Sequence, residues 1–357
     1  PLGFGAAGGT SSLATVNQVF GYEGGALCGA VVPNPACAGA APGQILNPQR
    51  LLVAGIPNST DLWRELDRKD DDVTWRINLD FTPTDHDLIY LSATKGSRAG
   101  GFNLVYFSAN ASYKTESLIS YELGYKGTLR DGTLQLNSAV YLYDYKHVET
   151  FGTGPSAFNP ADTSTSVFSV PSARIIGWDT DIDWLITDRL TLGANFSYTH
   201  SEYTDHFDID DPNDPARPPS LFNPQSAPID LNGKQMLQVP EMKGGVYAQY
   251  AYPLSGDHGT LTGLVNWSWI DKVYFSAFES NLDAAPAYQR TDLRLTWNST
   301  SGAWMVAGFV NNVFDEIGIR QVDHYGSTEA VDFVRNGATT DPRTMGVEVN
   351  YKFGALK

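Results

Sequence analysis

Residues 174–200 read "RIIGWDTDIDWLITDRLTLGANFSYTH", and this stretch decides the fold. Asp179, Asp181 and Asp183 stand at alternate positions, with mostly large apolar residues between and around them. Successive side chains of a β-strand point to opposite faces, so the pattern predicts a strand with one acidic face and one apolar face. In a soluble protein the apolar face would meet a core and the aspartates would meet water. In a membrane barrel the apolar face would meet lipid, and the aspartates would line a wet interior.

The same alternation recurs along the chain, in pairs of predicted strands joined by short polar turns. These turns are rich in Gly, Asp and Ser, as in "RDG" and "SGDHG". Longer polar stretches separate one pair from the next, at residues 101–116, 151–166, 205–235, 277–286 and 319–341. Short and long connections therefore alternate along about eleven strands, the first of them near residues 70–82. Outer-membrane barrels show this rhythm, whereas soluble β-sandwiches do not require it.

The sequence therefore predicts an all-β fold, an antiparallel up-and-down transmembrane β-barrel portion of about eleven strands. In this interpretation Trp178, Ile182 and Trp184 face lipid, while the three aspartates face the lumen. Alternation alone would fit a soluble two-layer fold equally well, and it is the rhythm of the connections that favours the barrel.

Composition narrows the class of protein further. The chain has 357 residues and a formal net charge of −16, without a basic stripe, so nucleic acid is not an expected partner. No run of 18 apolar residues is present, and "PLGFGAAGGT" at the N-terminus does not read as a signal peptide. Cys28 and Cys37 are the two cysteines. A disulfide closing a small loop is the favoured interpretation of this pair, and free thiols are the alternative.

The number of strands carries an expectation about the extent of the chain. The last predicted strand descends from the long stretch 319–341, and the first descends from residues 1–65, which look like another extracellular loop. An odd number of up-and-down strands cannot return to the rim from which it started. We therefore expect an ascending strand upstream of residue 1, which would make this chain a piece of a longer protein.

Four motifs together resemble the C-terminal barrel portion of TonB-dependent outer-membrane receptors. They are "LIYLSATKGSRAGGFN" (88–103), "YELGYKGTLRDGTLQLNSAVYLYDYKHVE" (121–149), "VNNVFDE" (310–316) and "DPRTMGVEVNYKF" (341–353). The resemblance implies a 22-stranded barrel closed by an N-terminal plug, of which residues 66–357 would form the C-terminal half. Neither the plug nor the TonB box of the family is recognised in this sequence.

The resemblance also implies a function, a location and partners. Members import scarce substrates such as ferric siderophores, vitamins or glycans across the bacterial outer membrane, with energy delivered by TonB to the N-terminal region. Lipid, lipopolysaccharide and the barrel assembly machinery would be further partners. The family's last strand commonly ends at an aromatic residue that serves as an assembly signal, and Phe353, followed here by "GALK", is expected to play that part.

Other motifs have weaker chemical interpretations. "KGSRAGG" (95–101) lacks the order of a phosphate loop and reads as the rim end of a strand, where Lys95 and Arg98 could touch an anionic substrate or lipopolysaccharide. The stretch "DHFDIDDPNDP" (205–215) is rich in aspartate, and carboxylates at short spacing suit calcium. The stretch lacks, however, the glycine and the closing glutamate of a calcium loop. A solvated loop is therefore favoured over a cation site. The candidate ligands are Asp205, Asp208, Asp210, Asp211 and Asp214.

No catalytic residue or cofactor is expected. Asp179, Asp181 and Asp183 lie side by side on one face without an opposing acid, and the sequence has no GxSxG motif. Tyr141, Tyr143 and Tyr145 share one face of a predicted strand and read first as an aromatic girdle or a lumen lining, and second as a substrate platform. Two rival functions are a passive porin-like barrel and a soluble extracellular carbohydrate-active enzyme.

Overall fold

The computed structural model describes residues 51–56, 59–64, 68–103, 110, 112–155, 163–209, 228–325 and 334–353. These residues form a sheet of eleven strands, in the order β21-β18-β17-β14-β13-β10-β9-β8-β7-β4-β3, with every neighbouring pair antiparallel. The strands are β3 (Trp75–Thr84), β4 (Asp87–Arg98), β7 (Glu116–Leu129), β8 (Leu134–Pro155), β9 (Thr163–Thr187), β10 (Leu190–Tyr203), β13 (Met242–Pro253), β14 (Thr260–Ile270), β17 (Tyr288–Asn298), β18 (Trp304–Asn311) and β21 (Thr344–Tyr351). The predicted antiparallel up-and-down sheet is confirmed.

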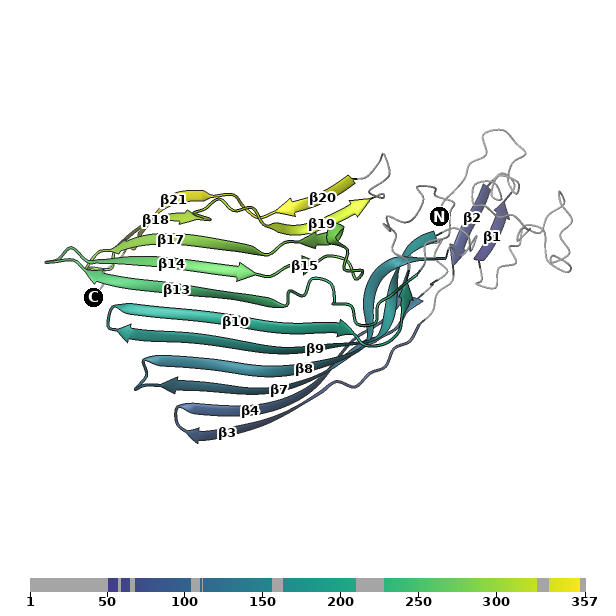
Figure 1. Ribbon diagram of the computed structural model, residues 1–357, viewed down its shortest axis with the longest axis horizontal. Helices are drawn as coiled ribbons and strands as arrows, with labels where there is room; N and C mark the ends of the chain where they lie inside the picture. The colour runs from purple at the N-terminus through teal and green to yellow at the C-terminus, as the bar shows by residue number, and fades with distance from the viewer. Residues whose placement is uncertain are drawn as a thin grey trace, which may run out of the picture.

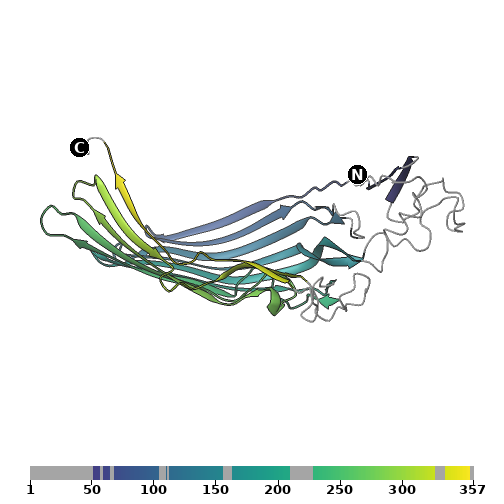
Figure 2. The same ribbon diagram turned by 90° about the horizontal axis from the view of Figure 1, so that it is seen from above.

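The strands lie side by side in chain order, and the sheet is curved (Figures 1 and 2). Tight turns join the strands at one end, at 85–86, 130–133, 188–189, 254–259 and 299–303. The longer connections lie at the opposite end (Figure 1). Among the described residues, no helix is long and apolar enough to cross a membrane.

The long connections carry small elements of their own. They are β5 (Gly101–Phe102) with β6 (Ser112–Tyr113), β11 (Asp208–Ile209) with β12 (Ile229–Asp230), β15 (Val273–Tyr274) with β16 (Ala284–Ala285), the 3-10 helix η2 (Asn281–Asp283), and β19 (Ile319–Tyr325) with β20 (Val334–Thr339). Before the sheet, β1 (Leu51–Ile56) pairs with β2 (Ser59–Arg64) in a separate hairpin. Cys28 and Cys37 lie outside the described residues, so their disulfide stays a prediction.

Two strands run further than the sequence pattern predicts. The stretch 151–166 reads as a polar loop, yet β8 and β9 are 22 and 25 residues long and stay paired up to Pro155 and Thr163. Their outer ends bend away from the direction of the sheet (Figure 1). Ser and Thr fill both faces of this part of β9, so no apolar period marks it, while backbone pairing continues regardless. At the other edge, β3 begins at Trp75, a few residues later than predicted.

Strand register gives the sheet two chemically distinct faces. Leu91, Leu123, Val140, Trp178 and Tyr198 are directly paired from β4 to β10 and therefore share one face. Most of the exposed apolar side chains of the eleven strands collect on that face, and they include Ile77, Leu79, Phe81, Leu91, Tyr121, Leu123, Val140, Ile176, Trp178, Val246, Tyr250, Val265, Leu293, Leu295, Trp304, Met345, Val347, Val349 and Tyr351. Such an expanse of exposed apolar surface is what a lipid-facing wall presents.

The buried core lies among the outer connections instead of on the sheet's apolar face. Tyr203, Leu231 and Val170 are completely buried there. They pack with Val148, Ala173, Ile209 and Ala277. Burial of apolar surface away from water thus stabilises the outer ends of β8, β9 and β10. The middle of the sheet is stabilised instead by backbone hydrogen bonds between strands and by contact of its apolar face with lipid.

Asn312, within the motif "VNNVFDE", makes hydrogen bonds to several parts of the chain. It follows β18 in a left-handed conformation, with φ at 53°, and is 1% exposed. Its backbone N–H donates to Asp292 Oδ1 at 2.8 Å, and its side-chain amide donates to the carbonyls of Glu316 and Asp341 at 2.7 and 3.2 Å. Its Oδ1 accepts from the Glu316 N–H at 2.9 Å. Asn312 therefore ties the end of β18 to β17 through its backbone N–H, and to the chain entering β21 through its side chain.

A charge placed on the apolar face tests its assignment. Val140 lies near the centre of the paired region of β8 and is 49% exposed. Val140→Arg should destabilise the protein in phospholipid vesicles by about 2–4 kcal/mol, measured by urea titration, because an arginine at the bilayer midplane cannot be solvated. The matched control is Asn195→Arg, on the opposite face and paired with Asp181 and Gly245, which should be tolerated. Equal effects of the two substitutions would contradict the assignment of faces.

Candidate functional site

The three aspartates of β9 lie on the polar face of the sheet. Register pairs Asp179 with Ala139 and Ser197, Asp181 with Asn137 and Asn195, and Asp183 with Gln135 and Gly193. Register places no lysine or arginine directly opposite these aspartates. Two of them accept hydrogen bonds from hydroxyl groups: Ser197 Oγ donates to Asp179 Oδ1, and Tyr247 Oη donates to Asp183 Oδ1 at 2.5 Å.

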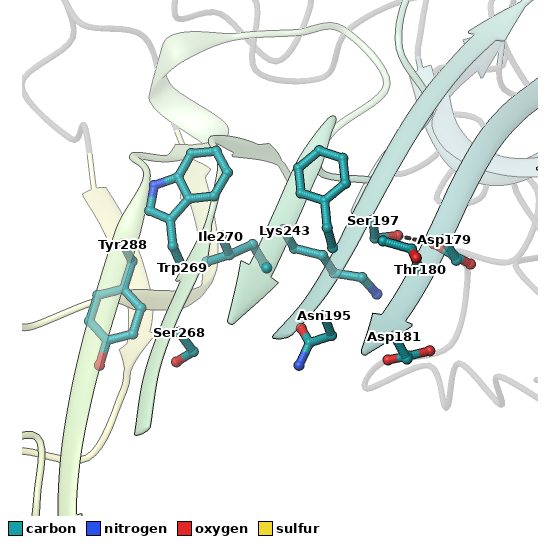
Figure 3. Close-up of a pocket in the computed structure, with 12 residues that line it drawn as sticks. Asp179, Thr180, Asp181, Asn195, Ser197, Lys243, Ser268, Trp269, Ile270 and Tyr288 are labelled. Atoms are coloured by element: carbon teal, nitrogen blue, oxygen red, sulfur yellow. Dashed lines mark hydrogen bonds between the residues drawn. The ribbon is translucent and has the colours of Figure 1, made fainter. Parts of the chain in front are cut away.

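A shallow hollow opens beside this row of aspartates. Its volume is about 500 Å³, and it runs across β9, β10, β13, β14 and β17. Figure 3 shows Asn195, Ser268 and Tyr288 on one side of the strands and Trp269 on the other. The polar lining residues include Asp179, Asp181, Asn195, Ser197, Lys243, Ser268 and Tyr288. The hollow therefore offers hydrogen-bond donors, hydrogen-bond acceptors and side chains of both charges, as a water-facing surface does.

Three tyrosines of the polar face lie over glycines of the neighbouring strand. Register sets Tyr90 opposite Gly124, Tyr141 opposite Gly177, and Tyr247 opposite Gly193. A Cβ on each glycine would lie 2.2, 2.2 and 1.9 Å from the ring opposite it. Each ring thus occupies the space that a side chain would need, so its hydroxyl reaches sideways along the sheet. Tyr90 Oη donates to Glu122 Oε1 at 2.6 Å in this way.

Tyr141 and Tyr143 are also on the polar face, next to each other. Their rings stack, with centroids 4.7 Å apart, and Tyr141 Oη is 3.2 Å from Thr199 Oγ1. This position favours a wall lining over a lipid-facing girdle. The apolar face carries a separate aromatic group near the tight turns, where Tyr351 contacts Trp304 and Phe353, with ring centroids 4.5 and 4.6 Å apart. Phe353 is 90% exposed, and its part as an assembly signal stays a prediction.

Lys95 and Arg98, at the outer end of β4, are both engaged by carboxylates. Lys95 Nζ bonds to Asp72, and Arg98 Nη2 lies 3.2 Å from Glu116 Oε2 and 2.8 Å from Glu149 Oε2. Two cations thus meet three carboxylates, so the local charge does not favour an anionic ligand. Contact with lipopolysaccharide remains a prediction for this rim.

The predicted acidic loop is described in part. Asp210, Asp211 and Asp214 lie outside the described residues, while Asp205 and Asp208 are exposed. The structure brings His206 between two carboxylates: His206 Nε2 is 3.1 Å from Asp208 Oδ2, and His206 Nδ1 is 2.9 Å from Asp230 Oδ2. Sequence reasoning missed Asp230, because the intervening chain hides the pairing of β11 with β12. These three residues are the one group of potential metal ligands found close together among the described residues.

Hydrogen bonding controls the charge state of this group. Asp230 Oδ1 accepts from the backbone N–H groups of Asn232 and Phe207, both at 3.0 Å. The Asn232 N–H, with His206 and Phe207, lowers the pKa of Asp230 to about 2. The two carboxylates in turn raise the pKa of His206, with the hydrogen bond to Asp230 as the largest cause. Below this raised pKa the group is an imidazolium between two carboxylates.

Comparison with known proteins identifies the family of this chain. The sequence profile of the TonB-dependent receptor-like β-barrel family matches residues 54–313. The chain belongs to this family, and its sheet is part of an outer-membrane β-barrel of Gram-negative bacteria. A curated relative, the probable TonB-dependent siderophore receptor PiuA of Acinetobacter baumannii, is 24% identical in an alignment of 292 residues that covers 79% of this chain and 34% of PiuA.

Solved structures show the same fold at low sequence identity. The ferric yersiniabactin uptake receptor FyuA of Yersinia pestis matches with a TM-score of 0.62 at 17% identity, covering 85% of this chain and 41% of FyuA. The crystal structure of PiuA matches with a TM-score of 0.56 at 19% identity, covering 78% of this chain and 36% of PiuA. The chain therefore spans well under half the length of these relatives.

The packing of tyrosine rings on glycines across the polar face can be tested by introducing a side chain at one of the glycines. Gly193→Leu should destabilise the folded protein by about 1–3 kcal/mol, because its side chain would overlap the ring of Tyr247. Combining it with Tyr247→Ala should recover part of that loss, as measured by urea titration in vesicles. Gly308→Leu is the control, since nothing lies within 4 Å of a Cβ there. Additive effects of the two substitutions at 193 and 247 would argue against the contact.

Proposed function

We propose that this protein serves in TonB-energised import of a small metal chelate, of the ferric siderophore class, across the outer membrane. Membership of the TonB-dependent receptor-like barrel family carries the proposal. The names of PiuA, a probable siderophore receptor, and of FyuA, a ferric yersiniabactin uptake receptor, support the substrate class. The particular chelate is left open, and vitamins or glycans remain alternatives within the same mode of transport.

The two faces of the sheet have separate parts in this proposal. The apolar face contacts lipid, and the polar face, with Asp179, Asp181 and Asp183, lines the interior of the barrel. A wall with hydrogen-bond donors, acceptors and side chains of both charges suits a water-filled passage or a polar plug. Polar groups that lie against such a wall keep hydrogen-bond partners, so they are not desolvated at a cost. The sheet-edge strands β3 and β21 need partners in the barrel, since unpaired backbone groups are costly in hydrocarbon.

No covalent chemistry is proposed. A soluble carbohydrate-active enzyme would bury its apolar strand faces in a core, whereas Leu79, Val347 and Met345 are 67%, 76% and 72% exposed. TonB, contacting the N-terminal region of the whole receptor, is the proposed energy source. Lipid, lipopolysaccharide and the barrel assembly machinery are the other partners that an integral outer-membrane location would bring.

Dependence on TonB separates the proposal from a passive porin. The full-length gene should restore uptake of radioactive iron, supplied as a panel of chelates, to a strain that lacks its own receptors. In the same strain without TonB, uptake should fall to the level seen without the gene. A porin-like barrel would instead keep its uptake in the absence of TonB and would show steady ion conductance in planar bilayers.

A further inference from the structure

The turn that follows β18 exposes two large apolar side chains. Phe314 and Ile317 are 69% and 71% exposed, and they lie outside the sheet, in the connection between β18 and β19. Single exposed apolar residues are common on protein surfaces, so their exposure alone has no functional meaning. The place of this turn at the end of the apolar face of the sheet gives it one.

Hydrogen bonds fix the turn at the outer end of the apolar face. The Val313 N–H donates to the Thr291 carbonyl at 2.8 Å, and Gln289 Nε2 donates to Glu316 Oε1 at 3.0 Å. Gln289 is directly paired with Trp269, which lies on the side of the sheet opposite to the polar lining residues (Figure 3). The Glu316 side chain therefore reaches the apolar side of the sheet.

Two tryptophans mark this level as the boundary of the apolar face. Trp267 and Trp269 are paired with Thr291 and Gln289, which are the first polar residues beyond Leu293 on that face of β17. Tryptophan combines a large apolar ring with one N–H donor, so it favours the boundary between hydrocarbon and the polar headgroups of a membrane. The turn is thus level with the expected outer boundary of the bilayer.

The height of the apolar face agrees with this boundary. At the opposite end, Tyr351 contacts Trp304 and Phe353, near the tight turns. The Ser299 N–H donates to the Trp304 carbonyl, and about ten residues of chain separate Ser299 from Gln289. Such a strand is about 33 Å long, and at a tilt of about 40° it spans about 25 Å, the height of the apolar band in outer-membrane barrels.

Arg343 adds a cation to the same edge. It stands two residues before Met345 and so continues the alternation that places the apolar side chains of β21 on this face. Its Nη1 donates to the Val313 carbonyl at 3.3 Å, and the part of the chain that the structure describes gives the guanidinium no ion pair. A basic side chain just beyond an apolar surface suits the phosphate groups of membrane lipid.

The polar groups of the turn have partners within the protein. Asn312 Oδ1 accepts from the Glu316 N–H at 2.9 Å, and Asp315 Oδ1 accepts from the Arg343 N–H at 2.7 Å. Contact of the turn with lipid would therefore leave few of its polar groups without hydrogen bonds, which lowers the cost of placing it at the membrane boundary.

We propose that residues 313–317 form an interfacial anchor, which places Phe314 and Ile317 among the acyl chains of the outer leaflet while Arg343 contacts the lipid phosphate groups. Continuity of the turn with the apolar face supports lipid as the occupant. The proposal rests on the assignment of that face to lipid and does not depend on the import function or on the substrate.

Photoactivatable lipids test the anchor. The full-length receptor would be reconstituted in phosphatidylcholine vesicles that carry a diazirine near the headgroup end of one acyl chain, and mass spectrometry would locate the labelled residues after illumination. The peptide with Phe314 and Ile317 should be labelled at least about threefold more than the peptide with Phe151, because only the former lies in lipid. Phe151 is 72% exposed, at the outer end of β8 beyond the apolar face.

The peptide that contains Val347 serves as the positive control, because this residue lies on the apolar face and is 76% exposed. Labelling of Val347 without labelling of the turn would overturn the anchor and leave the lipid assignment of the face intact. Absence of label from both peptides would overturn both assignments. Uptake of iron chelates, measured separately, would be unaffected by either result as evidence for the import function.

Variants give an independent measurement. Phe314→Ser combined with Ile317→Ser should lower the folding equilibrium constant in these vesicles by about tenfold or more, because two apolar side chains lose their burial in lipid. Phe151→Ser, the matched control, should change it by less than about threefold, as a substitution in water does. Equal losses would contradict the anchor. If the double variant does not refold, the labelling of the wild-type protein decides.

The contact of Arg343 with phosphate has its own test. Arg343→Glu should reduce labelling of the turn by about twofold or more, because its charge is repelled by the lipid phosphate groups, whereas Arg343→Lys should be labelled like the wild-type protein. Equal labelling of the two variants would remove Arg343 from the proposed anchor.

Discussion

Backbone hydrogen bonding is the constraint on which this structure depends. Inside a hydrocarbon layer every N–H and C=O needs a partner within the protein, so a strand can cross only as part of a continuous ladder. From β3 to β21 each strand pairs with its neighbour in the chain order of the sheet, and the tight turns lie at one end. The alternation of apolar and polar residues follows from this pairing, because each ladder sets the faces of the next strand.

The outer connections obey a different constraint. There the chain meets water, and it folds by burying apolar side chains as soluble proteins do. Tyr203, Leu231 and Val170 form a completely buried group at the outer ends of the strands. The protein therefore combines two kinds of stability: pairing and lipid contact in the sheet, and a small conventional core above it. Elements that this core joins, such as β11 and β8, should therefore lose stability together when the connection between β10 and β13 is changed.

The polar face is held together by hydroxyl groups as well as by ion pairs. Arg294 Nη2 and Glu348 Oε2 lie 2.7 Å apart, whereas the carboxylates of β9 accept from Ser197 and Tyr247. A hydroxyl satisfies a carboxylate without cancelling its charge.

The sequence by itself determined the class of fold, the approximate number of strands and the two faces. These features depend on a period of two and on turn residues, which are local properties of the chain. The structure decided what depends on register and on contacts distant in sequence. The pairing of Tyr90, Tyr141 and Tyr247 with glycines and the true length of β8 and β9 are of this kind. So is the meeting of His206 with Asp230. The polar outer ends of β8 and β9 have no periodic signal, because backbone hydrogen bonds pair them whatever their side chains are. A contact between side chains far apart in the chain leaves no local pattern either, because neither residue is near the other in the sequence.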